Sequence, residues 1–368
     1  MKKVLFVGLD VDDKAFHACG VDERGERQFE FSCRPNGGVL RKKLEAYAEL
    51  GVQLRVCYEA TYIGFSLQRQ LSAGAIHCDV IAPSLVPIIP GECVKTNRLD
   101  SLKLADYYSK GQLTVVHVPS EDEEAVRDLV RGRKFLTEQI RRQKQYVLSL
   151  CRRMGLDYRA GNARANYWTG PHMAWLERQV KEARHRALRF NLGSALDRIR
   201  QMKAEQSSYE VEIEYAANQP FYRRQVQALC CFRGIDVVSA MTLITEIGDV
   251  GRFAHPSRLP SYAGMDLREY SSGTEKRWGI TKMGNRHIRT TAVESSQYAR
   301  RLPRVSKQLK KRREGAEPLF IEIADRCMRR LHKKSTRLTF RGKHTNTVKM
   351  ACARELLCFV WEALKAAA

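Results

Sequence analysis

Two long stretches of polar, helical sequence, residues 121–156 and 173–217, most strongly limit how this chain can fold. Apolar residues recur in both at heptad-like spacing, but they are too sparse to give either helix a core of its own. The two stretches therefore predict a helical hairpin or coiled coil that needs a partner. We predict three parts: residues 1–119, a helical linker over residues 120–220, and residues 221–368.

The first part alternates between strand and helix patterns. Three strand-like runs joined by short turns come first, and strands and helices then take turns. This order predicts an α/β domain with a mixed sheet. The expected strands are residues 3–10, 15–21, 27–33, 53–58, 77–82 and 114–118, and the expected helices are residues 39–50, 63–72 and 101–109.

The last part predicts a mainly helical domain. Short helices are expected at residues 237–245 and 259–262, a polar loop at residues 269–284, and longer helices at residues 286–300 and 346–364. The fold class is therefore α/β followed by all-α.

The formal net charge of +23 indicates a polyanionic partner, and nucleic acid is the leading candidate. An anionic membrane surface is the second, but we find no amphipathic anchor helix with an aromatic face. No apolar run reaches the roughly 18 residues that a membrane span needs. The first residues enter a strand rather than a signal peptide, and the eleven cysteines include no C-x-x-C pair. These features predict a cytoplasmic protein with reduced thiols.

Three carboxylates lie where strands end or a helix begins. Asp10 closes the first expected strand, Glu59 follows the fourth, and Asp100 precedes the helix expected from Ser101. Neighbouring strand ends in an open α/β sheet meet at one edge, so these side chains can share a site for Mg²⁺ or Mn²⁺. Such a cation can activate a nucleophile at phosphorus. Each acid taken alone also suits a turn or a helix cap, as Asp100 does before Ser101.

Several motifs in order resemble the Piv-like transposases of the insertion-sequence family IS110. The acidic motifs are Gly8–Val11, Tyr58–Thr61 and Lys95–Asp100; the later ones are Glu246–Phe253, Tyr262–Gly264, Ser271–Gly273, Gly279–Asn285, Arg341–Lys343, Ala353–Leu356 and Phe359–Trp361. The resemblance spans nearly the whole chain. It implies an RNase H-like (RuvC-like) first domain and metal binding by Asp10, Glu59 and Asp100.

One position departs from the family pattern. The third acidic motif of the family usually offers two aspartates three residues apart, and here Asn97 takes the first place. An amide oxygen can bind a hard cation, but it brings no negative charge. Asn97 is therefore either a natural variant of the metal site or an inactivating substitution.

A serine pair lies in the expected loop, at Ser271 and Ser272 among several cations. Without further information this segment is typical of an ordinary solvated loop. The resemblance implies that Ser272 attacks DNA to form a phosphoserine link, with Ser271 as the alternative. It also implies that the acidic cluster meets the serine across subunits of a dimer or tetramer, and that a structured guide RNA takes part. Nothing in the sequence specifies RNA over DNA.

Basic residues near these motifs are candidates for phosphate contacts. They are Lys95, Arg98, Arg141, Arg142, Lys276, Arg277, Lys282, Arg286, Arg289, Lys311, Arg312, Arg341 and Lys343. Two tryptophans, Trp168 and Trp175, have two interpretations: stacking on unpaired bases, or packing at a helix junction.

Together with the acidic residues and the basic charge, the resemblance thus implies a transposase that cuts and rejoins DNA strands through metal and a serine–phosphate intermediate. Two alternatives remain open at this stage. A junction-resolving nuclease would use the same acids with water as nucleophile, and a non-catalytic nucleic-acid-binding protein would have Asn97 in a dead site.

Overall fold

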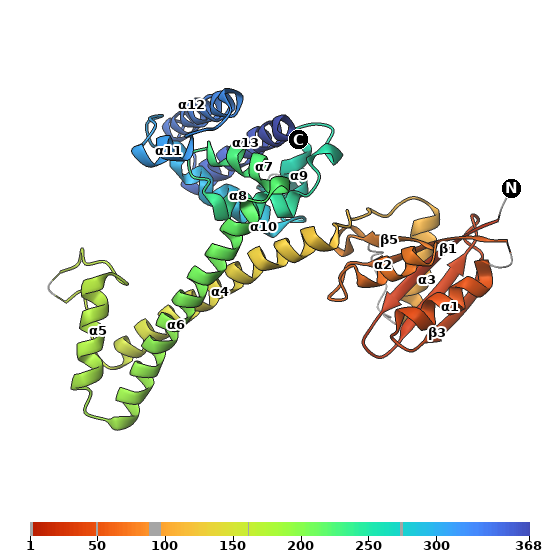
Figure 1. Ribbon diagram of the computed structural model, residues 1–368, viewed down its shortest axis with the longest axis horizontal. Helices are drawn as coiled ribbons and strands as arrows, with labels where there is room; N and C mark the ends of the chain where they lie inside the picture. Colours follow the sequence, from red (N-terminus) through yellow and green to blue (C-terminus); the bar gives the residue numbers. More distant parts are fainter. Residues whose placement is uncertain (1–2, 49–50, 88–96, 161, 273–274) are drawn as a thin grey trace. The chain divides into compact units, whose positions relative to one another are not determined.

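The computed structural model describes residues 3–48, 51–87, 97–160, 162–272 and 275–368, with only the backbone described within residues 269–278. The chain forms two compact units, Met1–Pro119 and Ser120–Ala368, drawn in Figure 1.

The first unit is built on a five-stranded mixed sheet in the order β3-β2-β1-β4-β5. Strand β1 is antiparallel to β2 and parallel to β4, β2 is antiparallel to β3, and β4 is parallel to β5. The mixed α/β character predicted from the sequence is confirmed. The strands are β1 (Val4–Val11), β2 (Phe16–Val21), β3 (Arg27–Cys33), β4 (Gln53–Glu59) and β5 (His77–Ile81).

The expected strand at residues 114–118 is wrong. Only Val115 pairs, through one antiparallel bridge to Ile81. The backbone makes two hydrogen bonds there, from Ala82 to Thr114 and from Val116 to Val80, and the chain then reaches Pro119. Proline cannot donate to a ladder, so the run ends before a strand develops.

The two faces of the sheet are covered by different helices. Alternate residues of β1, including Leu5, Val7 and Leu9, pack with α1 (Gly37–Ala48) and α2 (Ser66–Ala73) in the main core of the unit. The opposite face packs against α3 (Asn97–Ser109). The period-2 alternation of each strand thus assigns one set of side chains to each helical layer.

The second unit begins with a helical hairpin. Helix α4 (Glu121–Arg153) runs beside α6 (Arg186–Ala217), and α5 (Gly170–Glu182) folds back at the end remote from the helices of the C-terminal part (Figure 1). The predicted hairpin is present, but the single helix expected over residues 173–217 is wrong. Leu176 of α5 belongs to the same core as Leu192 and Leu196 of α6, and burying these apolar residues favours the fold-back although neither Gly nor Pro marks the break.

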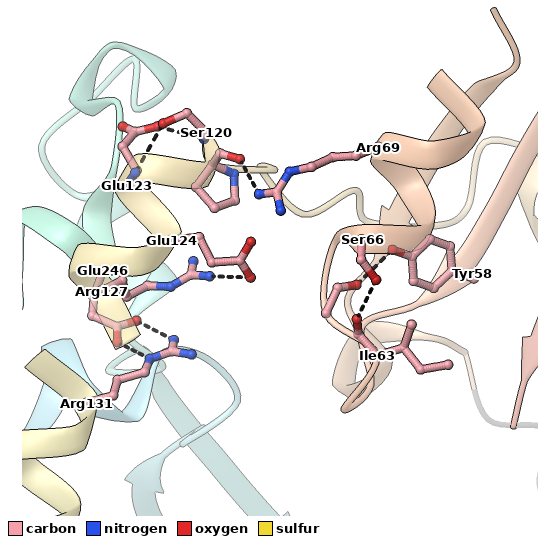
Figure 2. A network of polar contacts seen from close by, with 12 residues as sticks. Tyr58, Ile63, Ser66, Arg69, Ser120, Glu123, Glu124, Arg127, Arg131 and Glu246 are labelled. Atoms are coloured by element: carbon pink, nitrogen blue, oxygen red, sulfur yellow. Dashed lines mark hydrogen bonds and ion pairs between the residues drawn. The ribbon is translucent and has the colours of Figure 1, made fainter. Parts of the chain in front are cut away.

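A capping box starts α4. The Ser120 hydroxyl accepts from the Glu123 backbone N–H at 3.2 Å, and the Glu123 carboxylate accepts from the Ser120 N–H at 2.9 Å (Figure 2). Four acidic residues in the first turn complement the helix dipole. The beginning of this helix is therefore fixed by its own residues.

The remaining helices pack around one large core at the near end of the hairpin. The predicted mainly helical character is confirmed, although α7, α11 and α12 have no counterpart among the expected helices, and residues 286–300 form α10 followed by a 3-10 turn, η3 (Gln297–Arg300). The elements are α7 (Pro220–Cys230), α8 (Val237–Ile247), α9 (Arg258–Tyr262), α10 (Arg286–Ser296), α11 (Lys307–Arg312), α12 (Pro318–Phe340) and α13 (Thr345–Ala367).

The loop expected over residues 269–284 is wrong for most of its length. Strands β6 (Leu267–Ser272) and β7 (Glu275–Ile280) pair there as an antiparallel hairpin. The serine and glycine content masked the strand pattern around Tyr270 and Trp278. Across the described residues, none of the helices combines the length and apolar content that a membrane crossing requires.

Candidate functional site

Asp10 and Glu59 lie at neighbouring positions on neighbouring strands. In the parallel pair β1–β4, Leu9 is opposite Tyr58, so the next residue on each strand is one of the two acids. Paired positions in a sheet project to the same face, and both side chains are partly buried. The sheet therefore brings together two carboxylates that are far apart in the sequence.

Helix α3 covers this same face and runs against the direction of β1. The rings of Phe6 and Tyr108 lie 5.6 Å apart, whereas Gly8, two residues further along the strand, lies against Ser101 and Ala105. Residues later in β1 therefore lie beside earlier residues of α3. Asp10 is a further two residues along β1, an advance of about 6.6 Å. One helical turn advances about 5.4 Å, so Asp10 lies level with the first turn of α3.

That first turn contains Asn97 and Asp100. They precede the buried, sheet-facing residues Ser101 and Leu104 by four positions, which puts them on the same side of the helix. Asp100 is partly buried and Asn97 is exposed. Because the helix already includes Asn97, the expectation that α3 begins at Ser101 with Asp100 as its cap is wrong.

The chemistry of this donor set fits a hard divalent cation. It offers two adjacent carboxylates, a third on α3, and an amide oxygen. No three acids, histidines or cysteines within the described ranges are close enough to form a complete cage by themselves. Mg²⁺ usually takes one or two carboxylates and fills its remaining positions with water and substrate phosphate.

The serine pair lies at the end of β6. The ladder places Ser272 opposite Glu275 and Ser271 opposite Lys276. The strand ends are tied to α9 and the segment after it: Thr281 N–H donates to Asp266 O at 3.0 Å, and Lys282 N–H donates to Gly264 O at 2.9 Å. The serines are therefore carried on a β-hairpin with a fixed base.

Tight packing holds that base against α10. A Cβ at Gly284 would lie 2.3 Å from Tyr262 O, and φ at this glycine is +145°. Arg289 of α10 donates from Nη1 to Ala263 O at 2.6 Å, which joins the helix to the same segment. Only glycine fits at position 284, because a side chain there would clash with Tyr262 and the backbone conformation is one that other residues rarely adopt.

A buried carboxylate, Glu246 on α8, fixes the beginning of α10. Arg131 of α4 donates from Nε and Nη2 to the two oxygens of Glu246 at 2.7 and 2.9 Å (Figure 2). Asn285 donates from Nδ2 to Glu246 at 2.6 Å, and its own Oδ1 caps α10 by accepting from the N–H groups of His287 and Ile288. Three helices thus meet at one carboxylate, directly after the serine hairpin.

The electrostatics of this cluster follow from burial and pairing. Burial alone would raise the pKa of Glu246, but the hydrogen bonds and charge of Arg131 and the bond from Asn285 outweigh it and lower that pKa. Burial lowers the pKa of His287 and of Lys134 nearby. In the sequence, Glu246 and Asn285 belong to two of the motifs but have no predicted role. Their contact with each other and with Arg131 could not be predicted, because no local pattern links these three residues.

The predicted phosphate-binding residues fall into three groups. Exposed ones whose side chains form no ion pair or hydrogen bond with other described residues are Arg141, Arg142, Lys282, Lys311, Arg341 and Lys343. Others are engaged within the protein: Arg98 with Glu30, Arg286 with Glu138, Arg289 with Ala263, and Arg312 with the carbonyl of Ile235. Lys95 and the side chains of Lys276 and Arg277 lie outside the described residues.

Comparison with known proteins identifies the family. Residues 7–154 match the model of the IS110 transposase domain with the acidic DEDD signature, and residues 226–311 match the model of the transposase family IS116/IS110/IS902. A protein of Sinorhizobium fredii named as the putative transposase y4qE is 35% identical over 97% of this chain and 87% of its own length. The chain belongs to the IS110 family of transposases.

More distant relatives agree with this assignment. The transposase for insertion sequence element IS1533 of Leptospira borgpetersenii is 25% identical over 91% of this chain and 96% of its own length. The transposase for IS1111A of Coxiella burnetii is 24% identical over 80% of the chain and 78% of its own length. As a member of the IS110 family, the protein is an enzyme of DNA transposition. One matched region contains Asp10, Glu59 and Asp100, and the other contains Ser272.

Proposed function

We propose that the first unit is an RNase H-like metal domain in which Asp10, Glu59 and Asp100 hold Mg²⁺ or Mn²⁺, with the amide of Asn97 beside them. The observation that supports this best is the position of Asp10 and Glu59 on one face of β1 and β4, level with the first turn of α3. A sheet of an antiparallel meander followed by parallel strands suits that fold. The bound cation would neutralise phosphate charge during strand cleavage.

Ser272 is the proposed nucleophile. Its Oγ forms a bond to a DNA phosphorus, one P–O bond of the backbone breaks, and the departing strand end takes up a proton. A second strand end then displaces the serine, so DNA is rejoined without loss of the phosphate bond energy. The position at the end of a β-hairpin with a fixed base supports this role, because a nucleophile must be held in register with its target.

The long hairpin is proposed as a separate part, residues 120–220, that joins protomers in a dimer or tetramer. Phe135, Phe190, Val211 and Tyr215 on α4 and α6 are large apolar residues that remain exposed. Such surfaces are typical of protein–protein contacts. Light scattering of the full chain should give an oligomer, and a monomer at micromolar concentration would contradict this part of the proposal.

Double-stranded DNA and a structured guide RNA are the proposed nucleic-acid partners. The net charge of +23 and the exposed Arg141, Arg142 and Lys311 supply sites for phosphate on either. Removing RNA from the purified protein should abolish strand exchange on DNA that carries the element ends. Full activity of RNA-free protein would contradict the need for a guide.

Trapping of a covalent adduct tests the nucleophile. The full chain is incubated with labelled DNA carrying the element ends, with Mg²⁺ and the RNA transcribed from the element, and then denatured in detergent. We expect a protein–DNA adduct from the wild type and from Ser271→Ala, and none from Ser272→Ala. Adducts that persist in Ser272→Ala and vanish in Ser271→Ala would move the role to Ser271. Cleaved DNA without any adduct would indicate a nuclease that uses water.

A further inference from the structure

A cavity of about 410 Å³ lies at the end of the helical hairpin that carries α5. The last turn of α4, the segment after it and the first turns of α5 enclose it. The volume is within the range of pockets that hold small ligands. Its lining includes Arg152, Tyr158, Arg159, Tyr167, His172 and Trp175. None of these residues takes part in the strand exchange proposed above.

Aromatic rings form the wall of the cavity. The ring of Tyr158 lies 4.6 Å from that of His172 and 5.4 Å from that of Trp175, and His172 and Trp175 stack with 16° between their planes. Trp175 also packs on the core of the hairpin, which confirms helix-junction packing for this residue. Tyr158, Tyr167 and Trp175 nevertheless remain partly exposed, so the wall offers flat π surfaces to a ligand.

The wall also contains a hydrogen-bond donor that has no acceptor. His172 is fully buried, and its Nδ1 accepts from the backbone N–H of Trp168 at 2.9 Å. The proton of the neutral ring is therefore on Nε2, which has no partner within the described residues. Burial lowers the pKa of His172, which keeps the ring neutral. A buried donor without an acceptor is costly, so a group that accepts from Nε2 would be favoured there.

The rim of the cavity is cationic. Arg152 and Arg159 line it together with one carboxylate, Asp157. The guanidinium of Arg159 lies over the ring of Tyr167, 4.3 Å from its centroid, and Arg152 is exposed at the edge. A ligand that combines a flat ring, hydrogen-bond acceptors on the ring edge and a neighbouring phosphate matches the wall, the donor and the rim together.

We propose that this cavity binds one unpaired nucleobase of a nucleic-acid strand, with the base against Tyr158 and Trp175, an acceptor on its edge bound to His172 Nε2–H, and its phosphate at Arg152 and Arg159. A paired base cannot enter, because its faces are stacked and its edge is occupied in the duplex. The site therefore recognises a bulged or looped-out nucleotide. It is independent of the serine and of the acidic cluster.

Binding of a bulged duplex tests the site. The probe is a labelled duplex of about 20 base pairs with one unpaired adenosine, compared with the same duplex carrying an abasic unit at the bulge, each made in RNA and in DNA. Affinities of the full chain are measured by fluorescence anisotropy in roughly 0.2 M salt, where contacts to phosphate alone are weakened. We expect the wild type to bind the adenosine bulge roughly tenfold more tightly than the abasic bulge. The polymer with the larger ratio is the natural source of the base.

Variants separate the pocket from general charge. Trp175→Ala and Tyr158→Ala should each reduce the ratio of adenosine to abasic affinity toward one, and Trp175→Phe should keep most of it. Phe340→Ala is the control, since this exposed aromatic residue lies in the same unit outside the cavity. Circular dichroism establishes that each variant is folded. Equal affinities of the wild type for the two bulges, or equal ratios in wild type and both alanine variants, would overturn the proposal.

Discussion

Arg131 and Glu246 are 115 positions apart in the sequence and form a two-point ion pair in the second unit. Only 2% of the Glu246 side chain is exposed, against 40% of Arg131. The same carboxylate accepts from Asn285, the residue that caps α10 immediately after the serine hairpin. The long helix α4 is thereby joined to the base of the segment that carries Ser272.

Loss of this carboxylate should destabilise the second unit. Glu246→Gln removes the buried negative charge that pairs with Arg131. We therefore expect the free energy of unfolding to fall by about 2–4 kcal/mol. All four tryptophans lie in this unit, so their fluorescence during urea unfolding reports the change. Glu177→Gln, which breaks an exposed pair with Arg200, is the control and should show no measurable change. An equal fall in unfolding free energy in both variants would contradict the stabilising role of Glu246.

Acid should weaken the second unit in two stages. Burial lowers the pKa of His287 and of His172, so the unfolded chain binds their protons more readily than the folded chain. The stability that each contributes is present at neutral pH and is lost as pH falls below about 6.5, by at most about 1.4 kcal/mol per pH unit for each. The pKa of Glu246 is also lowered, and its contribution is lost in a later stage, below about pH 4.5.

The first stage can be assigned by substitution. His287→Gln should give a shallower fall in unfolding free energy between about pH 7.5 and 5.5 than the wild type, measured by urea titration with tryptophan fluorescence. The exposed His185 provides the control variant, His185→Gln, which should follow the wild type. An unchanged slope in His287→Gln would show that this side chain does not drive the loss.

A methyl group at Gly8 should displace α3 from the sheet. A Cβ there would lie 2.2 Å from Ser101 O and 2.5 Å from Ala105 N, both backbone atoms that cannot move aside alone. We expect Gly8→Ala to lower the unfolding free energy of the first unit by about 1–3 kcal/mol, and to weaken Mg²⁺ binding because Asp100 moves with the helix. Calorimetry measures both. Gly170→Ala is the control, since a Cβ at this glycine would meet no atom within 4 Å.

Restoring a carboxylate at Asn97 should strengthen the metal site. Asn97→Asp adds negative charge in the first turn of α3, where the helix dipole also favours it by about 0.3–1 kcal/mol. We expect tighter binding of Mg²⁺ and Mn²⁺ in calorimetric titration, and Asn166→Asp on the second unit should leave the affinity unchanged. Weaker or equal binding in Asn97→Asp would place residue 97 outside the site.

Most strands of the first unit could be predicted because short sequence patterns determine them. Alternating apolar residues and strand-end acids gave five of the strands within one or two residues, and the parallel register then explains why Asp10 and Glu59 meet. The prediction of a strand at residues 114–118 was wrong because an apolar run does not show how many backbone hydrogen bonds the segment makes to a neighbouring strand. The first turn of α3 was missed because Asn97 and Asp100 have weak helix propensity, and an aspartate before Ser101 is typical of a helix cap.

The second unit depends on contacts between distant residues, and these leave little trace in the sequence. The sequence around Ala183 does not indicate the break between α5 and α6, since the fold-back buries Leu176 in one core with residues of α6 such as Leu192. The pairing of Arg131 with Glu246 is likewise invisible to any window of sequence. The serine hairpin was hidden for a different reason: serine and glycine favour turns, and the strand residues around them are few.

The capping box at Ser120 and Glu123 has a consequence for protein engineering. The capping box satisfies backbone N–H groups at the start of α4 with side chains from Ser120 and Glu123 themselves. The helix start therefore does not depend on the sequence that precedes Pro119. A related first domain grafted at this junction would leave the helix start intact. Chimaeras built there would separate the contribution of each half to target choice.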